Sequence, residues 1–133
     1  MKFTFRKEER LKSRKIIGKL FTEGHSFISY PIRFVWVKME TPLSDSPLQM
    51  SLTVPKRAFS KAVDRNRLRR RIREAYRLNK HSLYETLEKE LPQEQRGLML
   101  IYVAKETLDF HEIEKGVKKG LGKMGRRISK VTD

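Results

Sequence analysis

Residues 56–77 constrain this chain more than any other part of it, because they combine dense positive charge with the apolar spacing of a helix. The segment reads KRAFSKAVDRNRLRRRIREAYR, and only Asp64 and Glu74 in it are acidic. Charge without apolar spacing is typical of a disordered tail, and apolar spacing without charge is typical of an ordinary core helix. The combination predicts a rigid helix that presents a cationic face to a polyanion.

The whole chain is strongly basic. Its 133 residues include 31 Lys and Arg against 16 Asp and Glu, a formal net charge of +15. A folded protein with such a charge repels itself unless an anionic partner compensates; nucleic acid is the commonest such partner, and an anionic membrane is the next candidate. The length suits a single small domain, residues 1–133, and we expect its ends, 1–8 and 125–133, to be frayed.

Several protein classes are disfavoured by what the sequence lacks. It contains no cysteine, which removes disulfides and thiolate sites and fits a reducing compartment. No secretory signal or long apolar run is visible, so we expect a cytoplasmic protein with no membrane partner. The three histidines are scattered and no hydrolase or metal-binding motif occurs, so we expect neither a catalytic residue nor a metal site on this chain.

Four segments show helical patterns. They are residues 13–21, residues 60–80 with Ser60 as the expected N-cap, residues 81–91, and a last helix after Asp109. The last helix starts with an Asp-x-x-Glu capping pattern and continues with an apolar stripe of Ile113, Val117 and Leu121. Three glycines inside it lower its helix propensity, namely Gly116, Gly120 and Gly122.

Three segments are expected to be strands: residues 31–40, 49–54 and 97–104. The second is expected to run antiparallel to the first. The third is a nearly continuous apolar run, which suits a central strand covered on both faces. Residues 25–29 are a candidate for a further short strand. The order α-β-β-(β)-α-β-α predicts an α+β domain in which the basic helix leads from residues 49–54 to residues 97–104.

A helical wheel divides the basic helix into two sides. The side predicted to be buried consists of Leu68, Ile72, Ala75 and Tyr76. The outward ridge consists of Asn66, Arg70, Arg73 and Arg77, flanked by Arg67 and Glu74. Arginine suits a phosphate backbone because its planar guanidinium can bond phosphate through two N–H groups. Arg65 falls near the edge of the buried side, so either it reaches around the helix start or the first turn is irregular.

A dense charge run often indicates only a solvated surface. A solvated helix face would normally mix Lys and Glu as i,i+4 partners. Here only two acidic residues interrupt a dense array of arginines, which favours nucleic-acid binding. A structural RNA-binding protein, such as a ribosomal protein, fits the charge and size equally well. A DNA-binding regulator fits less well, because a recognition helix usually follows a short turn from a partner helix, and here strands flank the helix.

Residues 56–77 resemble the protein subunit of bacterial ribonuclease P. The shared pattern is a basic pair, Ala-Val, Arg-Asn-Arg before an aliphatic residue, a further basic pair, Ile-Arg and an aromatic residue. This chain supplies Lys56-Arg57, Ala62-Val63, Arg65-Asn66-Arg67-Leu68, Arg69-Arg70, Ile72-Arg73 and Tyr76. The early Leu20-Phe21-x-x-Gly24 and the order of the later elements are also similar, so the resemblance covers most of the chain.

The resemblance implies an α/β sandwich with a left-handed βαβ crossover through the basic helix, an exception to the usual right-handed rule. It implies a ribonucleoprotein endoribonuclease whose RNA subunit, with Mg²⁺, performs the hydrolysis, while the protein binds ribonuclease P RNA and precursor tRNA. We expect no cofactor bound by the protein alone and a monomer when it is free. The expected RNA-binding residues are Lys56, Arg57, Lys61, Arg65, Asn66, Arg67, Arg69, Arg70, Arg73 and Arg77.

The resemblance also implies a cleft for the 5′ leader of precursor tRNA, between the sheet and the first helix. The expected leader-binding residues are Ile17, Phe21, Phe34 and Trp36. Ile17 and Val37 stand where the family often has aromatic residues, which leaves Phe34, Trp36 or Tyr30 as candidates for the missing stacking surface. Core packing is the alternative for Phe21, Phe34 and Trp36.

Overall fold

The structure is a computed structural model that describes residues 4–131. Its elements in chain order are η1 (Lys7–Glu9), α1 (Arg14–Glu23), β1 (His25–Ser29), β2 (Ile32–Lys38), β3 (Leu48–Thr53), α2 (Ala62–Asn79), α3 (His81–Glu90), β4 (Arg96–Tyr102) and α4 (Phe110–Val131). Each predicted helix and strand is present, including the candidate strand at residues 25–29. At the ends for which we predict fraying, η1 begins at Lys7 and α4 continues to Val131, while residues 1–3 and 132–133 lie outside the described part.

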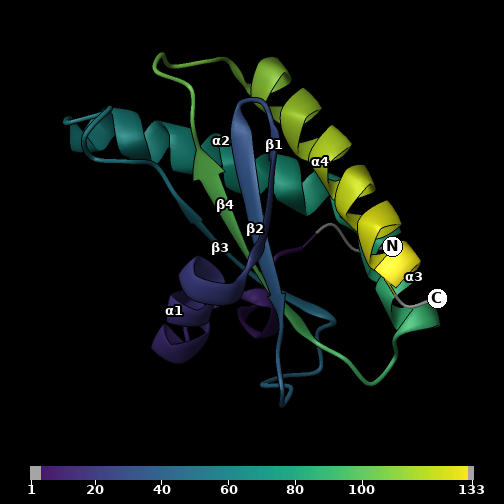
Figure 1. The fold of residues 1–133 in the computed structure, drawn as a ribbon. Helices are drawn as coiled ribbons and strands as arrows, with labels where there is room; N and C mark the ends of the chain where they lie inside the picture. The colour runs from purple at the N-terminus through teal and green to yellow at the C-terminus, as the bar shows by residue number, and fades with distance from the viewer. Residues whose placement is uncertain (1–3, 132–133) are drawn as a thin grey trace.

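The four strands form one mixed sheet in the order β1-β2-β4-β3 (Figure 1). β2 pairs antiparallel with both β1 and β4, and β3 pairs parallel with β4. β3 therefore runs opposite to β2, as predicted, but it does not pair with β2, because β4 lies between them. The central position of β4 explains its nearly continuous apolar sequence, since helices cover both of its faces.

The connection from β3 to β4 is a left-handed crossover through α2 and α3. In Figure 1 both strands point upward, β4 lies to the right of β3, and α2 passes behind the sheet. A right-handed connection through a helix behind the sheet would instead place β4 to the left of β3. The unusual hand that the resemblance implies is therefore confirmed.

Helix α1 covers one face of the sheet. Ser13 caps it by accepting a hydrogen bond from the Ile16 backbone N–H at 3.3 Å. Ile16 and Leu20 pack into a small cluster with side chains of β2 and β4. The helix comes so close to β4 that a Cβ on Gly97 would lie 2.9 Å from a methyl carbon of Ile16.

Helices α2, α3 and α4 cover the opposite face and enclose the larger core. The capping pattern of α4 is confirmed, because an Asp109 carboxylate oxygen accepts a hydrogen bond from the Glu112 N–H at 2.9 Å. Gly120 lies against the ring of Phe34, so that a Cβ there would be 2.2 Å from two ring carbons. A glycine that weakens α4 as an isolated helix thus allows it to pack against the sheet.

Candidate nucleic-acid interface

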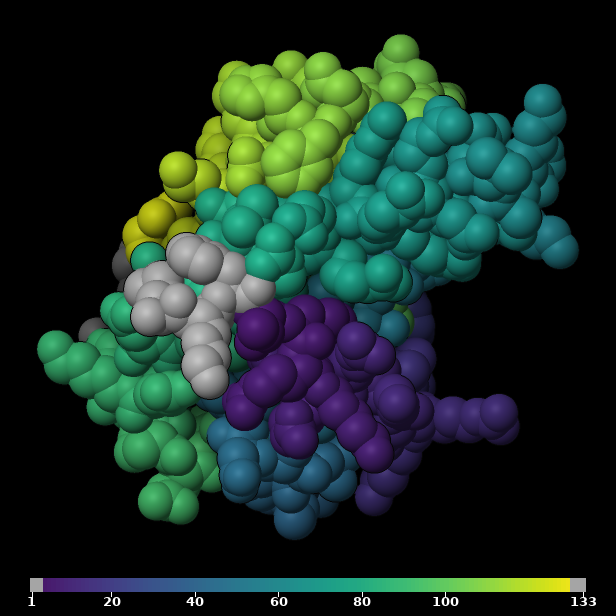
Figure 2. Space-filling model, turned by 180° about the vertical axis from the view of Figure 1, so that it is seen from behind, coloured from purple at the N-terminus to yellow at the C-terminus, as the bar shows by residue number. Residues whose placement is uncertain are grey.

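The apolar side of α2 holds the helix rigidly against the core. Leu68, Ile72, Ala75 and Tyr76 are all fully buried, as the helical wheel predicts. They pack with residues of β3, β4 and α4 in the larger core. The opposite side of α2 is therefore presented to solvent on a fixed support, and Figure 2 shows this helix, in teal, exposed along one face of the molecule.

Three arginines on the outer side of α2 are exposed and have no protein partner among residues 4–131. They are Arg67, Arg70 and Arg73. Asn66 beside them is exposed, and its side-chain oxygen accepts a hydrogen bond from the Arg69 guanidinium at 3.2 Å. These side chains of the predicted ridge and of its flank have the chemistry of a phosphate-binding surface, because unpaired guanidinium groups stand on consecutive turns.

Two other arginines of α2 bind the protein itself. The guanidinium of Arg65 donates to the carbonyl oxygens of Phe59 and Ser60, at 2.8 and 2.9 Å. Arg65 thus reaches around the helix start, which was one of the two expectations for it. Arg71 donates to the Leu108 carbonyl, which ties α2 to the loop before α4. Ser60 is not the N-cap, because Lys61 occupies that position and makes no side-chain capping bond.

The last residue of the predicted ridge is engaged within the helix. Arg77 is half-buried and forms a salt bridge with Glu74, three residues earlier. The Arg77 guanidinium holds the pKa of the Glu74 carboxyl below its ordinary value. Because this local carboxylate offsets its charge, Arg77 is a weaker candidate for binding RNA than Arg70 or Arg73.

The loop before α2 carries the other predicted cations. Lys56, Arg57 and Lys61 are all exposed, and Phe59 anchors the loop by burying its ring against Tyr102, with ring centroids 5.6 Å apart. Val63 on the first turn of α2 is 68% exposed. A large apolar side chain so exposed beside unpaired cations marks a contact surface. We did not single out Val63 for this role from the sequence, because an aliphatic residue in a helix reads as core.

The exposed side of α1 presents the other predicted surface. Phe21 is 63% exposed, and Ile17, one turn earlier, is half-buried. Beyond the end of α1, the same face of the sheet is uncovered along the paired row Arg33, Ile101 and Thr53. We did not predict this row, although the alternation of β2 places Arg33 on the same face as Val35, which α1 covers.

Phe34 and Trp36 lie on the other face of the sheet, in the core. Phe34 is fully buried and stacks on Phe27 with ring centroids 5.0 Å apart, and Trp36 is 4% exposed and stacks on His25. The core-packing alternative accounts for both residues. As folded, neither ring is accessible from the α1 side, so we leave both out of the proposed cleft. Tyr30 is 60% exposed, but it lies in the β1–β2 turn against α4.

Two findings concern membrane spans and metal sites in the described part of the chain. No helix within residues 4–131 is long and apolar enough to cross a membrane. In the same part of the chain, no three His, Asp or Glu side chains are grouped so that they could hold a metal ion.

The fold and this surface define a small α+β protein with a basic helix on a left-handed crossover and the surface chemistry of a nucleic-acid-binding protein. Residues 5–125 match the family model described as Ribonuclease P. A ribonuclease P protein component from Porphyromonas gingivalis is 37% identical over 119 residues, which are 90% of this chain and 85% of that protein. The chain therefore belongs to the ribonuclease P protein family, and it is a subunit of an RNA-binding ribonucleoprotein, the tRNA-processing endoribonuclease ribonuclease P.

Solved structures agree on the fold. The ribonuclease P protein from Thermotoga maritima superposes with a TM-score of 0.64 at 22% identity, covering 86% of this chain and 96% of that one. A mutant ribonuclease P protein from Staphylococcus aureus gives a TM-score of 0.67 at 18% identity, with 90% of each chain covered. The α+β fold predicted from the resemblance is thereby confirmed.

Proposed function

We propose that this chain binds ribonuclease P RNA through α2 and the 5′ leader of precursor tRNA through the α1 face. The observation that carries the proposal is the set of exposed arginines on α2, Arg67, Arg70 and Arg73, which have no partner among the described residues. Lys56, Arg57, Lys61 and Asn66 extend this surface, and Arg69 borders it. Neutralising RNA phosphates with such cations releases counterions and stabilises the complex.

On the other face, Phe21 and Ile17 provide an apolar surface beside the uncovered sheet row that includes Arg33. An exposed aromatic ring can stack on a base of single-stranded RNA, which contributes roughly 1–3 kcal/mol per base. A nearby cation can bind the adjacent phosphate. This combination supports a leader-binding role for the α1 face.

The chemical step belongs to the RNA subunit in this proposal. Phosphodiester hydrolysis is expected from that RNA with its Mg²⁺. The protein lowers the repulsion between two polyanions and holds the leader. We propose that the free protein is a monomer and that the complex acts in the cytoplasm.

Reconstitution tests the proposal. The purified chain is mixed with ribonuclease P RNA at low Mg²⁺, and cleavage of precursor tRNA is followed with and without protein. We expect faster cleavage with the protein, and weaker assembly for Arg70→Ala/Arg73→Ala. Lys118→Ala/Lys119→Ala, which removes the same charge from exposed positions of α4, is the matched control.

Two results would contradict the proposal. One is cleavage at low Mg²⁺ that the protein does not accelerate. The other is equal loss of assembly in the α2 and α4 double variants, which would reduce the role of α2 to net charge. Co-purification of the chain with ribosomal RNA in place of ribonuclease P RNA would support a structural RNA-binding protein.

A further inference from the structure

We propose that a notch at the free edge of β3 binds phosphate groups of an RNA strand, as a second contact beside the outer ridge of α2. The proposal rests on the proposed function, because it assumes that α2 meets RNA. It adds a site made from a part of the chain far from α2 in sequence. The N-terminal segment before α1, residues 4–12, supplies one wall of this notch.

The notch has a volume of about 360 Å³ and lies between the N-terminal segment and α2. Arg10 and Lys12 line it from one side, and Arg69 and Arg73 line it from the other. Ser51 and Leu52 of β3 lie between these walls. In Figure 2 the N-terminal segment, in purple, lies directly beside α2, in teal. Four cationic side chains from two separate segments thus surround one small hollow.

The edge of β3 is open at this place. The Leu11 N–H donates to the Met50 carbonyl at 3.0 Å, so the N-terminal segment covers the edge of β3 up to that residue. Backbone groups alternate in direction along a strand, which directs the N–H and C=O of Leu52 to the same edge. Within residues 4–131 no partner is found for them. The notch therefore offers a backbone N–H as well as cations to an anion.

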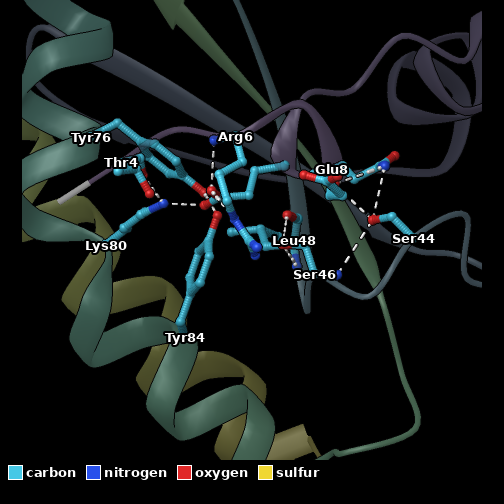
Figure 3. A network of polar contacts seen from close by, with 11 residues as sticks. Thr4, Arg6, Glu8, Ser44, Ser46, Leu48, Tyr76, Lys80 and Tyr84 are labelled. Carbon is cyan, nitrogen blue, oxygen red and sulfur yellow. Dashed lines mark hydrogen bonds and ion pairs between the residues drawn. The ribbon is translucent and has the colours of Figure 1, made fainter. Parts of the chain in front are cut away.

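A buried ion pair holds the N-terminal wall in place. The Lys80 ammonium binds the Glu9 carboxylate, and both side chains are almost completely buried (Figure 3). Lys80 also donates to the Thr4 carbonyl, and the ring of Phe5 packs edge-on against Tyr76. Arg10 follows directly after Glu9, so its position opposite α2 depends on this pair. The notch is consequently a fixed feature of the fold and not a chance approach of surface side chains.

The charges in the notch favour phosphate over other ligands. Arg10, Lys12, Arg69 and Arg73 make no ion pair with any residue in the described part of the chain. Like charges gathered around one hollow repel each other, and an anion relieves this repulsion. A peptide strand could instead pair with the open edge of β3, but its backbone carries no charge to offset the four cations. RNA phosphate satisfies the cations and the free N–H together.

A double-mutant cycle tests whether the two walls bind the same phosphate. Lys12→Ala, Arg73→Ala and the double variant are titrated with ribonuclease P RNA and, separately, with a single-stranded leader oligonucleotide, at several salt concentrations. The slope of log K against log salt is negative, and we expect Lys12→Ala to make it less steep by about one. We expect the double variant to lose less affinity than the product of the two single losses, by about twofold or more. Lys7→Ala, in the same segment but outside the notch, is the matched control and should combine with Arg73→Ala as a simple product.

The two RNAs identify the source of the phosphate. A coupled loss with ribonuclease P RNA assigns the notch to the RNA subunit, and a coupled loss with the leader assigns it to the substrate; either supports the proposal. The notch proposal would be overturned if Lys12→Ala changed the affinity for both RNAs no more than Lys7→Ala does. The same result is expected if the notch binds a peptide. If Arg73→Ala and Arg70→Ala are also without effect, the proposed function fails as well. If Arg70→Ala and Arg73→Ala weaken RNA binding as expected but Lys12→Ala has no effect, the notch proposal fails and the proposed function stands.

Discussion

Glu9 and Lys80 are the residues on which the N-terminal segment depends most. Their side chains are 2% and 3% exposed, so neither charge is solvated. Glu9→Gln leaves Lys80 buried without its counter-charge, and loss of one partner from a buried pair costs about 3–5 kcal/mol. We expect a loss of that size in the free energy of unfolding at neutral pH, measured by urea denaturation. Glu8→Gln, at the exposed neighbouring position, should change it by less than about 0.5 kcal/mol. Equal effects of the two variants would contradict this prediction.

The same carboxylate makes stability depend on pH. Burial by itself would raise the pKa of Glu9, but hydrogen bonds from the Arg6 backbone, Lys80 and Tyr84 outweigh burial, and the pKa is lowered from its ordinary value of 4.5. A carboxyl with a lowered pKa stabilises the fold above its unfolded pKa, and this contribution is lost as the pH falls through the folded pKa. The gap in unfolding free energy between the original chain and Glu9→Gln should therefore narrow below about pH 4.5. A gap that stays constant down to about pH 3 would show that Glu9 is not the group that titrates.

The arginines of α2 divide into structural and exposed ones. Arg71→Ala removes a charged hydrogen bond to the Leu108 carbonyl, and such bonds contribute about 1.5–3 kcal/mol. We expect a loss of stability of that order on thermal unfolding. Arg67→Ala, at an exposed position, should leave stability within about 0.5 kcal/mol but weaken RNA binding. A stable Arg71 variant together with an unstable Arg67 variant would reverse this assignment.

At the scale of the element, α4 shows how one helix uses glycines in two ways. A Cβ at Gly120 would lie 2.2 Å from the Phe34 ring, whereas at Gly122 the nearest atom is the end of the Arg126 side chain at 3.5 Å. Alanine gains up to about 1 kcal/mol of helix propensity at either position, but overpacking a core costs about 1–3 kcal/mol. We expect Gly122→Ala to raise the melting temperature and Gly120→Ala to lower it. A rise in both variants would mean that α4 shifts away from the sheet without cost.

The sequence predicted this helix and most other elements, because apolar spacing and caps are local. It predicted the buried side of α2 correctly for the same reason. It did not show which face of β2 lies under α1, because residues 34–37 are apolar in succession and a run without alternation does not distinguish the two faces. Phe34 and Trp36 were therefore placed in the cleft, although they lie in the core. The pairing of Glu9 with Lys80 joins residues 71 positions apart in the chain, and no local pattern indicates it.

At the scale of the whole molecule, the two proposed RNA surfaces lie on opposite sides of the sheet, with α1 in front and α2 behind in Figure 1. A chain with a net charge of +15 can bind polyanions on both sides at once, and each complex should weaken as salt is raised. The sheet and the core lie between the two surfaces, so no residue of one surface contacts the RNA bound at the other. Changes on one side should therefore leave binding on the other side unaffected.

This separation predicts different substrate effects for the two surfaces. Phe21→Ala should weaken binding of precursor tRNA to the holoenzyme, at a cost of roughly 1–3 kcal/mol if a leader base stacks on this ring. It should leave the affinity for mature tRNA and for ribonuclease P RNA unchanged, because neither contains the leader. Arg70→Ala should instead weaken assembly with ribonuclease P RNA. In the Phe21→Ala/Arg70→Ala double variant, the two losses in free energy should add. Binding measured with precursors of different leader length separates the effect of Phe21→Ala from that of Arg70→Ala. The Phe21→Ala effect should vanish once the leader is too short to reach α1. An effect of Phe21→Ala that persists with mature tRNA would show that the α1 face binds something other than the leader.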